Sequence, residues 1–313
     1  MTVRSDEFPP RVAAPVVAGV DGSAGSDRAV RWAAATAAAR GRTLRLVHAV
    51  DLEPVRALTG AAPLVGTLRV RAGAVLLAAA ELAARTAPEV RVRTELAEGA
   101  PAGALIDRSA GAHMVVLGAT GTGGTAAHLG STLLAVGTHG HGAVVVVRDR
   151  EFDRRCGPAG PVVLGVDGGA AGAPAIATAF AEASARGAEL LVLHSWIDLP
   201  YGEFAGASDG VDDPDLADTA KRMVSEQLAG WGEKYPEVEV HRELYLSGPR
   251  HHLLRWSRTA QLLVVGSRGR GGFAGLLFGS TSTALVQRAH CPVLVAHGGR
   301  AGTDGPDLRS RVP

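Results

Sequence analysis

The sequence predicts an α/β protein with two similar domains in tandem, each built on a parallel sheet with helices on both faces. Strand-like and helix-like segments alternate along the chain, which is the pattern of parallel sheets with helical crossovers. The 313 residues are enough for two domains of ordinary size. Three residues of the first half also recur in the second half at nearly constant spacing. Asp21 and Asp167 lie 146 residues apart, as do His48 and His194, and Gly118 and Gly266 lie 148 residues apart.

The composition is that of a globular protein with balanced charge. Hydrophobic residues make up 46% and charged residues 20%, and 32 Lys and Arg against 31 Asp and Glu give a net charge of +1. This balance argues against a nucleic-acid partner or an anionic membrane surface. Cys156 and Cys291 form no disulfide framework and lack zinc-ligand spacing. Without a signal peptide or a run that approaches a membrane span, the sequence predicts a cytoplasmic protein.

In the first half, predicted strands and helices alternate from the end of a loose N-terminal tail to a last strand at 144–147. Apolar runs predict strands at 16–20, 44–50, 114–117 and 144–147, and alternation of apolar residues predicts one at 90–96. Helical patterns occupy 24–40, which Gly41 ends, and 68–86, after a linker that contains Pro54 and Gly60. Two shorter helices begin at Pro101 and after Gly130.

The second half repeats this order. Strands are predicted at 162–166, 190–196, 238–246, 262–265 and 293–296. Helices are predicted at 170–186, through Ala229 after the acidic loop 208–215, from Gly248-Pro249, and after Gly279. We therefore expect domains at 1–148 and 161–297, a polar, turn-rich linker at 149–160, and a disordered tail at 298–313.

The residues that could carry chemistry follow the first and fourth strands of each half. In an open parallel sheet, ligands bind beyond the carboxyl ends of the strands, where the strand order reverses. An Asp follows the first strand and a glycine-rich loop follows the fourth, so both converge on one crevice if those strands are neighbours. Glycines allow a close backbone approach, and a helix start binds phosphate. A nucleotide suits such a crevice.

The spacing of these residues resembles the universal stress protein family in its tandem form. The resemblance rests on Asp21-Gly22-Ser23, on a histidine near the end of each second strand, and on Gly266-x2-Gly269-x9-Gly279-Ser280, and it covers about 15–148 and 161–297. It implies flavodoxin-like (Rossmann-like) domains, each with a five-stranded parallel sheet of order 3-2-1-4-5 and ATP in a cleft. Many members bind ATP with little hydrolysis, some bind none, and their biology is regulation under stress, starvation or dormancy.

The resemblance also implies the contacts, position by position. In the second domain, adenine would meet Asp167 and the backbone of Ser195, ribose would border Val265 and Gly266, and phosphates would meet Gly269, Arg270, Gly279, Ser280 and Thr281. The matching positions in the first domain are Asp21, Ala49, Leu117, Gly118, Gly121, Gly130, Ser131 and Thr132.

The two copies depart from the family pattern in different ways. Eight residues, not nine, separate Gly121 from Gly130, and this loop has no Lys or Arg, whereas the second copy has Arg268 and Arg270. In the second domain, Asp167 is followed by two glycines, so the hydroxyl of Ser23 has no counterpart. These departures predict that the second domain is the main nucleotide site.

Several features also have simpler interpretations. Glycine-rich loops arise as plain turns, Asp21 and Asp167 could cap helices, and His48 and His194 fit packed core positions on apolar strands. The arginines at 268 and 270 are either solvated charges or anion partners. The loops lack the Lys of a Walker A motif, and their late position argues against a dinucleotide fingerprint. Histidines at 139, 141, 251 and 252 lack nearby carboxylates or thiols for a metal, and Cys291 is expected to be buried and inert.

The sequence thus predicts an ATP-binding regulatory protein that uses ATP alone or with Mg²⁺ and hydrolyses little or none of it. No nucleophile, base and orienter set stands out, so it is not expected to be an enzyme beyond a weak ATPase. A slow nucleotide hydrolase or transferase and a nucleotide-free interaction module are the alternatives. The resemblance implies a pseudo-dimer in which strands 144–147 and 293–296 pair antiparallel, with a homodimer as a further assembly.

Overall fold

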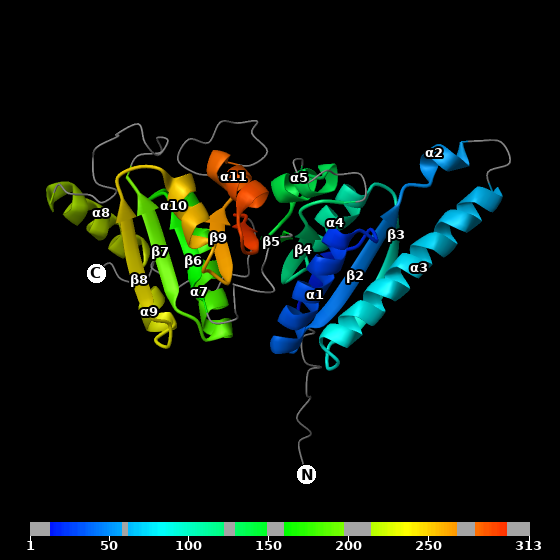
Figure 1. The fold of residues 1–313 in the computed structure, drawn as a ribbon, viewed down its shortest axis with the longest axis horizontal. Helices are drawn as coiled ribbons and strands as arrows, with labels where there is room; N and C mark the ends of the chain where they lie inside the picture. Colours follow the sequence, from blue (N-terminus) through cyan, green and yellow to red (C-terminus); the bar gives the residue numbers. More distant parts are fainter. Residues whose placement is uncertain are drawn as a thin grey trace, which may run out of the picture.

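The chain folds into two α/β halves that share one ten-stranded sheet (Figure 1). The computed structural model describes residues 13–57, 62–121, 129–148, 160–196, 214–267 and 279–298. The predicted linker and tail lie outside these ranges, except for Gly160 and Gly298. The strand order is β3-β2-β1-β4-β5-β10-β9-β6-β7-β8, so each half has the order 3-2-1-4-5. The predicted fold class is confirmed.

The first half alternates strands and helices as the sequence predicts. Its strands are β1 (Val16–Gly19), β2 (Thr43–Val50), β3 (Arg91–Glu98), β4 (Met114–Gly118) and β5 (Ala143–Val147). Its helices are α1 (Ala24–Ala39), α2 (Glu53–Arg56), α3 (Ala62–Thr86), α4 (Pro101–Ser109) and α5 (Ser131–His139). All neighbouring strands within this half pair in parallel.

The second half repeats the arrangement. Its strands are β6 (Val162–Val166), β7 (Leu190–Ser195), β8 (Val240–Tyr245), β9 (Leu262–Gly266) and β10 (Val293–Ala296). Its helical elements are the 3₁₀ turn η1 (Ala170–Gly172), α7 (Ala173–Arg186), α8 (Pro214–Gln227), α9 (Trp231–Lys234), α10 (Pro249–Trp256) and α11 (Ser280–Arg288). These strands are also parallel to one another.

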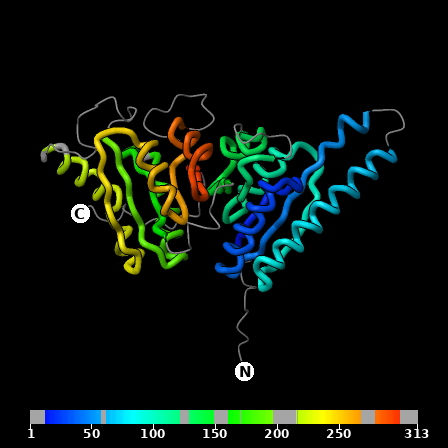
Figure 2. Tube along the Cα trace, in the orientation of Figure 1, coloured from blue at the N-terminus to red at the C-terminus, as the bar shows by residue number. Residues whose placement is uncertain are grey.

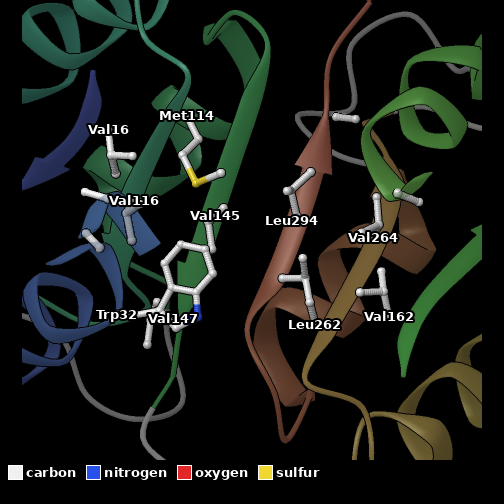
Figure 3. Close-up of a cluster of buried hydrophobic side chains, with 14 of the residues drawn as sticks. Val16, Trp32, Met114, Val116, Val145, Val147, Val162, Leu262, Val264 and Leu294 are labelled. Carbon is white, nitrogen blue, oxygen red and sulfur yellow. The ribbon is translucent and has the colours of Figure 1, made fainter. Parts of the chain in front are cut away.

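The halves join where β5 and β10 pair antiparallel. Val293 lies opposite Val146 and Ala296 opposite Ala143, so each strand covers what would otherwise be an exposed sheet edge. Figure 3 shows the buried side chains on both sides of this junction, from Val145 and Val147 on β5 to Leu294 on β10. The antiparallel pairing that the resemblance implied is therefore confirmed.

Helices cover both faces of the sheet, which explains why its central strands are continuous apolar runs. The buried cluster on one face contains residues of α1, α3, α7 and α8, and the cluster on the other contains residues of α4, α5, α10 and α11. The trace of Figure 2 shows the two halves side by side, with the first half in blue to green and the second in green to red. Both clusters draw on both halves, so the hydrophobic core is continuous across the junction.

Four segments differ from the sequence prediction. The short α2 lies in the predicted linker, because Pro54 occupies the first turn, where its missing N–H costs no hydrogen bond. The long helix begins at Ala62, six residues before the predicted start, and α9 was not predicted. The helix predicted from residue 170 starts as a 3₁₀ turn and becomes α-helical at Ala173, and no side chain among the described residues caps it.

Helix α3 is more apolar than the sequence analysis anticipated. By length and composition alone, it is long and apolar enough to cross a membrane. Of its most apolar 18-residue window, 17% is buried. Leu64, Val70 and Leu77 are exposed on it, whereas Ala72, Leu76 and Ala79 are buried. Because the buried face packs on α1, β2 and β3, α3 is one of the helices that cover the sheet.

A buried ion cluster connects the two halves next to the junction. Arg40, which ends α1, donates from Nη2 to Oε2 of Glu182 on α7 at 2.6 Å, and Arg186 Nε lies 3.2 Å from the same oxygen. The Glu182 side chain is only 3% exposed. Burial alone would raise the pKa of this carboxyl, but the Arg40 hydrogen bond and the charges of both arginines hold the pKa below its ordinary value.

His113 and Trp32 extend this cluster. Arg40 Nη1 lies 2.9 Å from His113 Nε2, and because a guanidinium can only donate, the imidazole nitrogen accepts. Burial, followed by the charges of Arg42 and Arg40, lowers the pKa of His113 to about 4. The guanidinium of Arg186 lies 5.4 Å from the centroid of the Trp32 ring, in cation–π geometry.

Candidate functional site

A pocket of about 800 Å³ opens at the carboxyl ends of β1 and β4 in the first half. These strands are neighbours, and β2 lies on the far side of β1, so the strand order reverses here. The pocket is lined by every position of the first half that the resemblance assigns to a nucleotide: Asp21, Ala49, Leu117, Gly118, Gly121, Gly130, Ser131 and Thr132. The structure thus brings together residues that are far apart in the sequence.

Asp21 holds the turn between β1 and α1. Gly22 has φ of 78°, which favours glycine, and Oδ1 of Asp21 accepts from Ser23 N at 2.9 Å. Ser23 is the N-cap of α1, and its hydroxyl accepts from Ser26 N at 3.1 Å. A Cβ placed on Gly121 would lie 2.7 Å from Asp21 Oδ2, so the second carboxylate oxygen borders the start of the glycine loop.

Gly118 and Gly25 let the end of β4 pack directly on the start of α1. A Cβ on Gly118 would lie 2.5 Å from the carbonyl carbon and oxygen of Gly25. A Cβ on Gly25 would lie 2.1 Å from the carbonyl oxygen of Thr120. The clashing atoms belong to the backbone and cannot move away as the end of a flexible side chain can. Both positions therefore require glycine for β4 and α1 to pack together beside the pocket.

The start of α5 presents backbone N–H groups to the pocket. Gly130 is the N-cap, and no side chain among the described residues caps the helix. Leu134 N donates to Gly130 O at 3.0 Å, which is a hydrogen bond of the first helical turn. The N–H groups of Ser131 and Thr132 come before this bond, so they have no acceptor within the helix. Such N–H groups, together with the helix dipole, favour an anion.

His48 lies at the pocket, which the sequence analysis did not predict. It was interpreted as a core residue together with His194, and His194 is indeed buried at 1% exposure. His48 is half-buried and lines the pocket, while its Nδ1 lies 2.6 Å from Val20 O. The position of His48 at the end of a strand beside the reversal point is the sequence signal that would have found it.

Apolar side chains form the remaining wall. Pro101 and Leu105 of α4 and Leu129 and Leu133 near α5 line it. Binding pockets commonly combine such walls with a few directed polar groups. From the sequence, Pro101 was predicted only to start a helix, and its position at the pocket was not expected.

The second half repeats the backbone of this site where it is described. Asp167 Oδ1 accepts from Gly169 N at 2.8 Å, as Asp21 accepts from Ser23 N. Strands β6 and β9 are neighbours, so Asp167 and Gly266 lie at the same sheet edge. Val265 is buried at the end of β9, and Ser195 ends the adjacent β7.

The start of α11 also follows the pattern of the first half. Gly279 is its N-cap, and Gly279 N donates to Ser267 O at 3.2 Å. Ser280 and Thr281 form the first turn, and Ser282 Oγ donates to Gly266 O at 2.8 Å. The predicted phosphate residues Gly269 and Arg270, like Arg268, lie outside the described residues.

One group of metal-ligand type occurs among the described residues, at the opposite edge of the sheet. Glu189, Glu239 and His241 place ligand atoms within 4.8 Å of one another at the starts of β7 and β8, and all three are exposed. His241 is not among the histidines that were weighed as metal ligands from the sequence. Cys291 is buried at 2% exposure, as expected, and Cys156 lies outside the described residues.

Comparison with known proteins identifies the relatives of this chain. The model of the universal stress protein family matches residues 14–148 and again 159–297. A universal stress protein of Mycobacterium tuberculosis strain H37Rv is 38% identical over 288 residues, which cover 90% of this chain and 95% of that protein. One from Mycolicibacterium smegmatis is 38% identical over 291 residues, with 90% and 96% covered.

A solved structure supports the architecture. The universal stress protein from Archaeoglobus fulgidus DSM 4304 superposes with a TM-score of 0.66, covering 92% of this chain and 99% of that one at 20% identity. At this identity the likeness concerns the fold alone. It extends over both halves, so it includes their tandem arrangement.

Proposed function

The chain belongs to the universal stress protein family, and from this premise we propose that it is a regulatory protein that binds adenine nucleotides. ATP is its main ligand, alone or with Mg²⁺, and the second domain is the main ATP site. The protein acts in the cytoplasm in the response to stress or dormancy. Its two domains work as a pseudo-dimer, and a homodimer is a further form of assembly.

The observation that carries the nucleotide-binding part of this proposal is the pocket of the first half, whereas the assignment of the main site to the second domain rests on the spacing of its loop. Its volume of about 800 Å³ lies within the usual range for small-ligand sites, roughly 300–1,000 Å³. It combines an apolar wall, one carboxylate, several hydroxyls and the start of α5, and it lies where α/β sheets bind nucleotides. The described part of the second half repeats the turn at Asp167 and the helix start at Ser280.

The same lining supports a binding protein rather than an efficient hydrolase. The carboxylate of Asp21 accepts a backbone N–H, and the imidazole of His48 contacts a backbone carbonyl, so both groups serve the local fold. A general base must reach its proton donor within about 3 Å. Among the described lining residues, no nucleophile is paired with a base and an orienting group.

Titration with ATP tests the proposal, with Gly279→Val and Gly130→Val each blocking one helix start. A Cβ on Gly130 would have Gly121 N as its nearest atom, at 4.0 Å, so the first site can be blocked without a backbone clash. We expect Gly279→Val to lose most ATP binding. Undiminished binding in that variant would contradict the assignment to the second domain.

The alternatives make different predictions. A slow hydrolase or transferase gives multiple turnovers with Mg²⁺ and ATP, whereas the proposal expects bound nucleotide to survive purification unhydrolysed. A nucleotide-free interaction module gives no released nucleotide by mass spectrometry and no thermal shift when ATP is added. Stoichiometry per chain in the same mass-spectrometry experiment counts the occupied sites.

A further inference from the structure

We infer that the outer face of α3 is a dimer interface, on which α3 of a second copy of this chain packs antiparallel. The inference rests on the proposed function for the homodimer and adds the surface through which the two copies meet. It arises from the distribution of apolar residues around α3, from a comparison with the corresponding helix of the second half, and from the charges along α3.

Helix α3 carries two stripes on opposite sides. The inner stripe is buried and packs on α1, β2 and β3; it consists of Ala72, Leu76, Ala79 and Ala83. The outer stripe lies two residues before each of these, or about 200° around the helix, so it points away from the sheet. Its members are exposed, Val70 at 74% and Leu77 at 62%; they are Val70, Ala74, Leu77 and Glu81.

The outer stripe has the spacing of a coiled-coil seam. Its residues alternate at intervals of four and three, and the exposed Thr67 and Ala84 continue the alternation at the two ends. This alternation keeps one seam facing a partner helix. A helix that is apolar on both sides is ordinarily covered on both. In Figure 1, α3 runs along the outer end of the first half, away from the junction of β5 and β10, where a second copy has access to it.

The corresponding helix of the second half, α8, has a polar outer face. The buried pair Ala72 and Leu76 matches Ala220 and Val224, which are 1% and 0% exposed and lie 148 residues later. Counted from this pair, the positions of the outer stripe hold polar, exposed residues in α8: Asp218, Arg222 and Ser225. The fold therefore does not require an apolar outer face on this helix, and the stripe of α3 needs a separate explanation.

The charges along α3 favour a second copy in antiparallel orientation. We pair Ala74 of each copy with Leu77 of the other, the two central residues of the stripe. The same alignment places Glu81 of each copy beside Arg71 of the other, so the ion pair forms twice about the two-fold axis. Among the described residues Arg71 has no ion pair, and Glu81 lies 3.6 Å from Arg85, which is too long for a hydrogen bond. A parallel pair would instead bring like charges together.

A contact of one helix pair is small. Interfaces that bury less than about 1,200 Å² belong to weak and transient complexes, so we expect a dissociation constant on the order of 10 µM. At concentrations well below this value the chain is a monomer, and Glu81 then serves only its own helix.

Sedimentation velocity of the full chain without added nucleotide, between about 1 and 200 µM, brackets the expected constant. We expect a monomer–dimer equilibrium that Leu77→Ser weakens about tenfold or more, because two buried leucines are lost per dimer. Leu64 is the matched control, since it is 46% exposed on the same helix but lies outside the stripe. Leu64→Ser should leave the dissociation constant unchanged.

An exchange of charges tests the antiparallel alignment. Arg71→Glu should weaken the dimer about tenfold, because the new carboxylate faces Glu81 of the other copy twice. Adding Glu81→Arg should restore the original dissociation constant.

The outcomes separate the inference from the proposed function. A monomer throughout the concentration range, a dimer that Leu77→Ser leaves intact, or no rescue by the exchange of charges overturns the inference. A membrane partner also overturns it: the chain would then co-sediment with vesicles of phosphatidylcholine and phosphatidylserine instead of dimerising, and Leu77→Ser would abolish this. None of these measurements uses ATP, so their failure leaves the ATP titration unaffected, and failure of that titration leaves the dimer.

Discussion

Removing the charge of Glu182 tests whether the ion cluster between the halves stabilises the fold. Glu182→Gln keeps the size of the side chain but leaves Arg40 and Arg186, whose side chains are 10% and 19% exposed, without their carboxylate. Removing one member of a buried ion pair typically destabilises a protein by about 3–5 kcal/mol, because the remaining charge stays buried without compensation. Gln still accepts one hydrogen bond, so we expect about 3 kcal/mol.

The measurement is the free energy of unfolding in urea, with Glu81→Gln as the matched control. Glu81 forms an exposed ion pair with Arg85 on α3, where the side chains are 58% and 66% exposed. Such a surface pair contributes less than about 0.5 kcal/mol, so the control variant should unfold almost like the unmodified chain.

A double-mutant cycle isolates the contact between the halves. In the chain with both Arg40→Gln and Glu182→Gln, neither charge is left alone, so the combined loss should be smaller than the sum of the single losses by about 1–3 kcal/mol. Equal effects of Glu182→Gln and Glu81→Gln, or strict additivity in the cycle, would refute the reasoning that this cluster stabilises the junction.

Three further predictions concern single residues. Burial and two neighbouring arginines lower the pKa of His113 from 6.5 to about 4, so the unfolded chain takes up a proton there at a higher pH than the folded one. Stability present above pH 6.5 should therefore be lost as pH falls toward 4, and His113→Asn should flatten the urea midpoint across this window. Ser23→Ala should cost about 1 kcal/mol through loss of the N-cap, measured by thermal unfolding. Gly118→Ala should cost about 1–3 kcal/mol, since its Cβ would overlap the Gly25 backbone, and an unchanged urea midpoint would contradict that packing.

The fold could be predicted largely because parallel strands that are buried on both faces have continuous apolar sequences. The segments at 162–166 and 293–296 match β6 and β10 residue for residue, and the repeat fixed the order of the remaining elements. The start of α3 was missed because its outer side is also apolar, so periodicity does not mark where the helix begins. The 3₁₀ turn η1 follows Gly169, which has no hydroxyl to cap a helix, and among the described residues no side chain caps α7; the sequence showed the missing hydroxyl but not the turn.

The clustering of the assigned residues was predictable where they follow strand ends, whereas contacts that depend on tertiary packing were not predictable. All the assigned positions of the first half reach one pocket because strand order brings β1 and β4 together. His48 was assigned to the core because it lies on an apolar strand, although its position near the carboxyl end of that strand pointed to the pocket. The contact of Arg40 with Glu182 spans 142 residues and leaves no local signal.

The two halves share a backbone plan but differ in the residues that a ligand would meet, and this difference is informative. A copy that had only a structural role would need the glycines at 25 and 118, which the packing of α1 on β4 demands. It would not need an open pocket lined by hydroxyls at the start of α5. The first half keeps both features although its loop lacks the arginines of the second, so packing alone does not account for the residues that line its pocket.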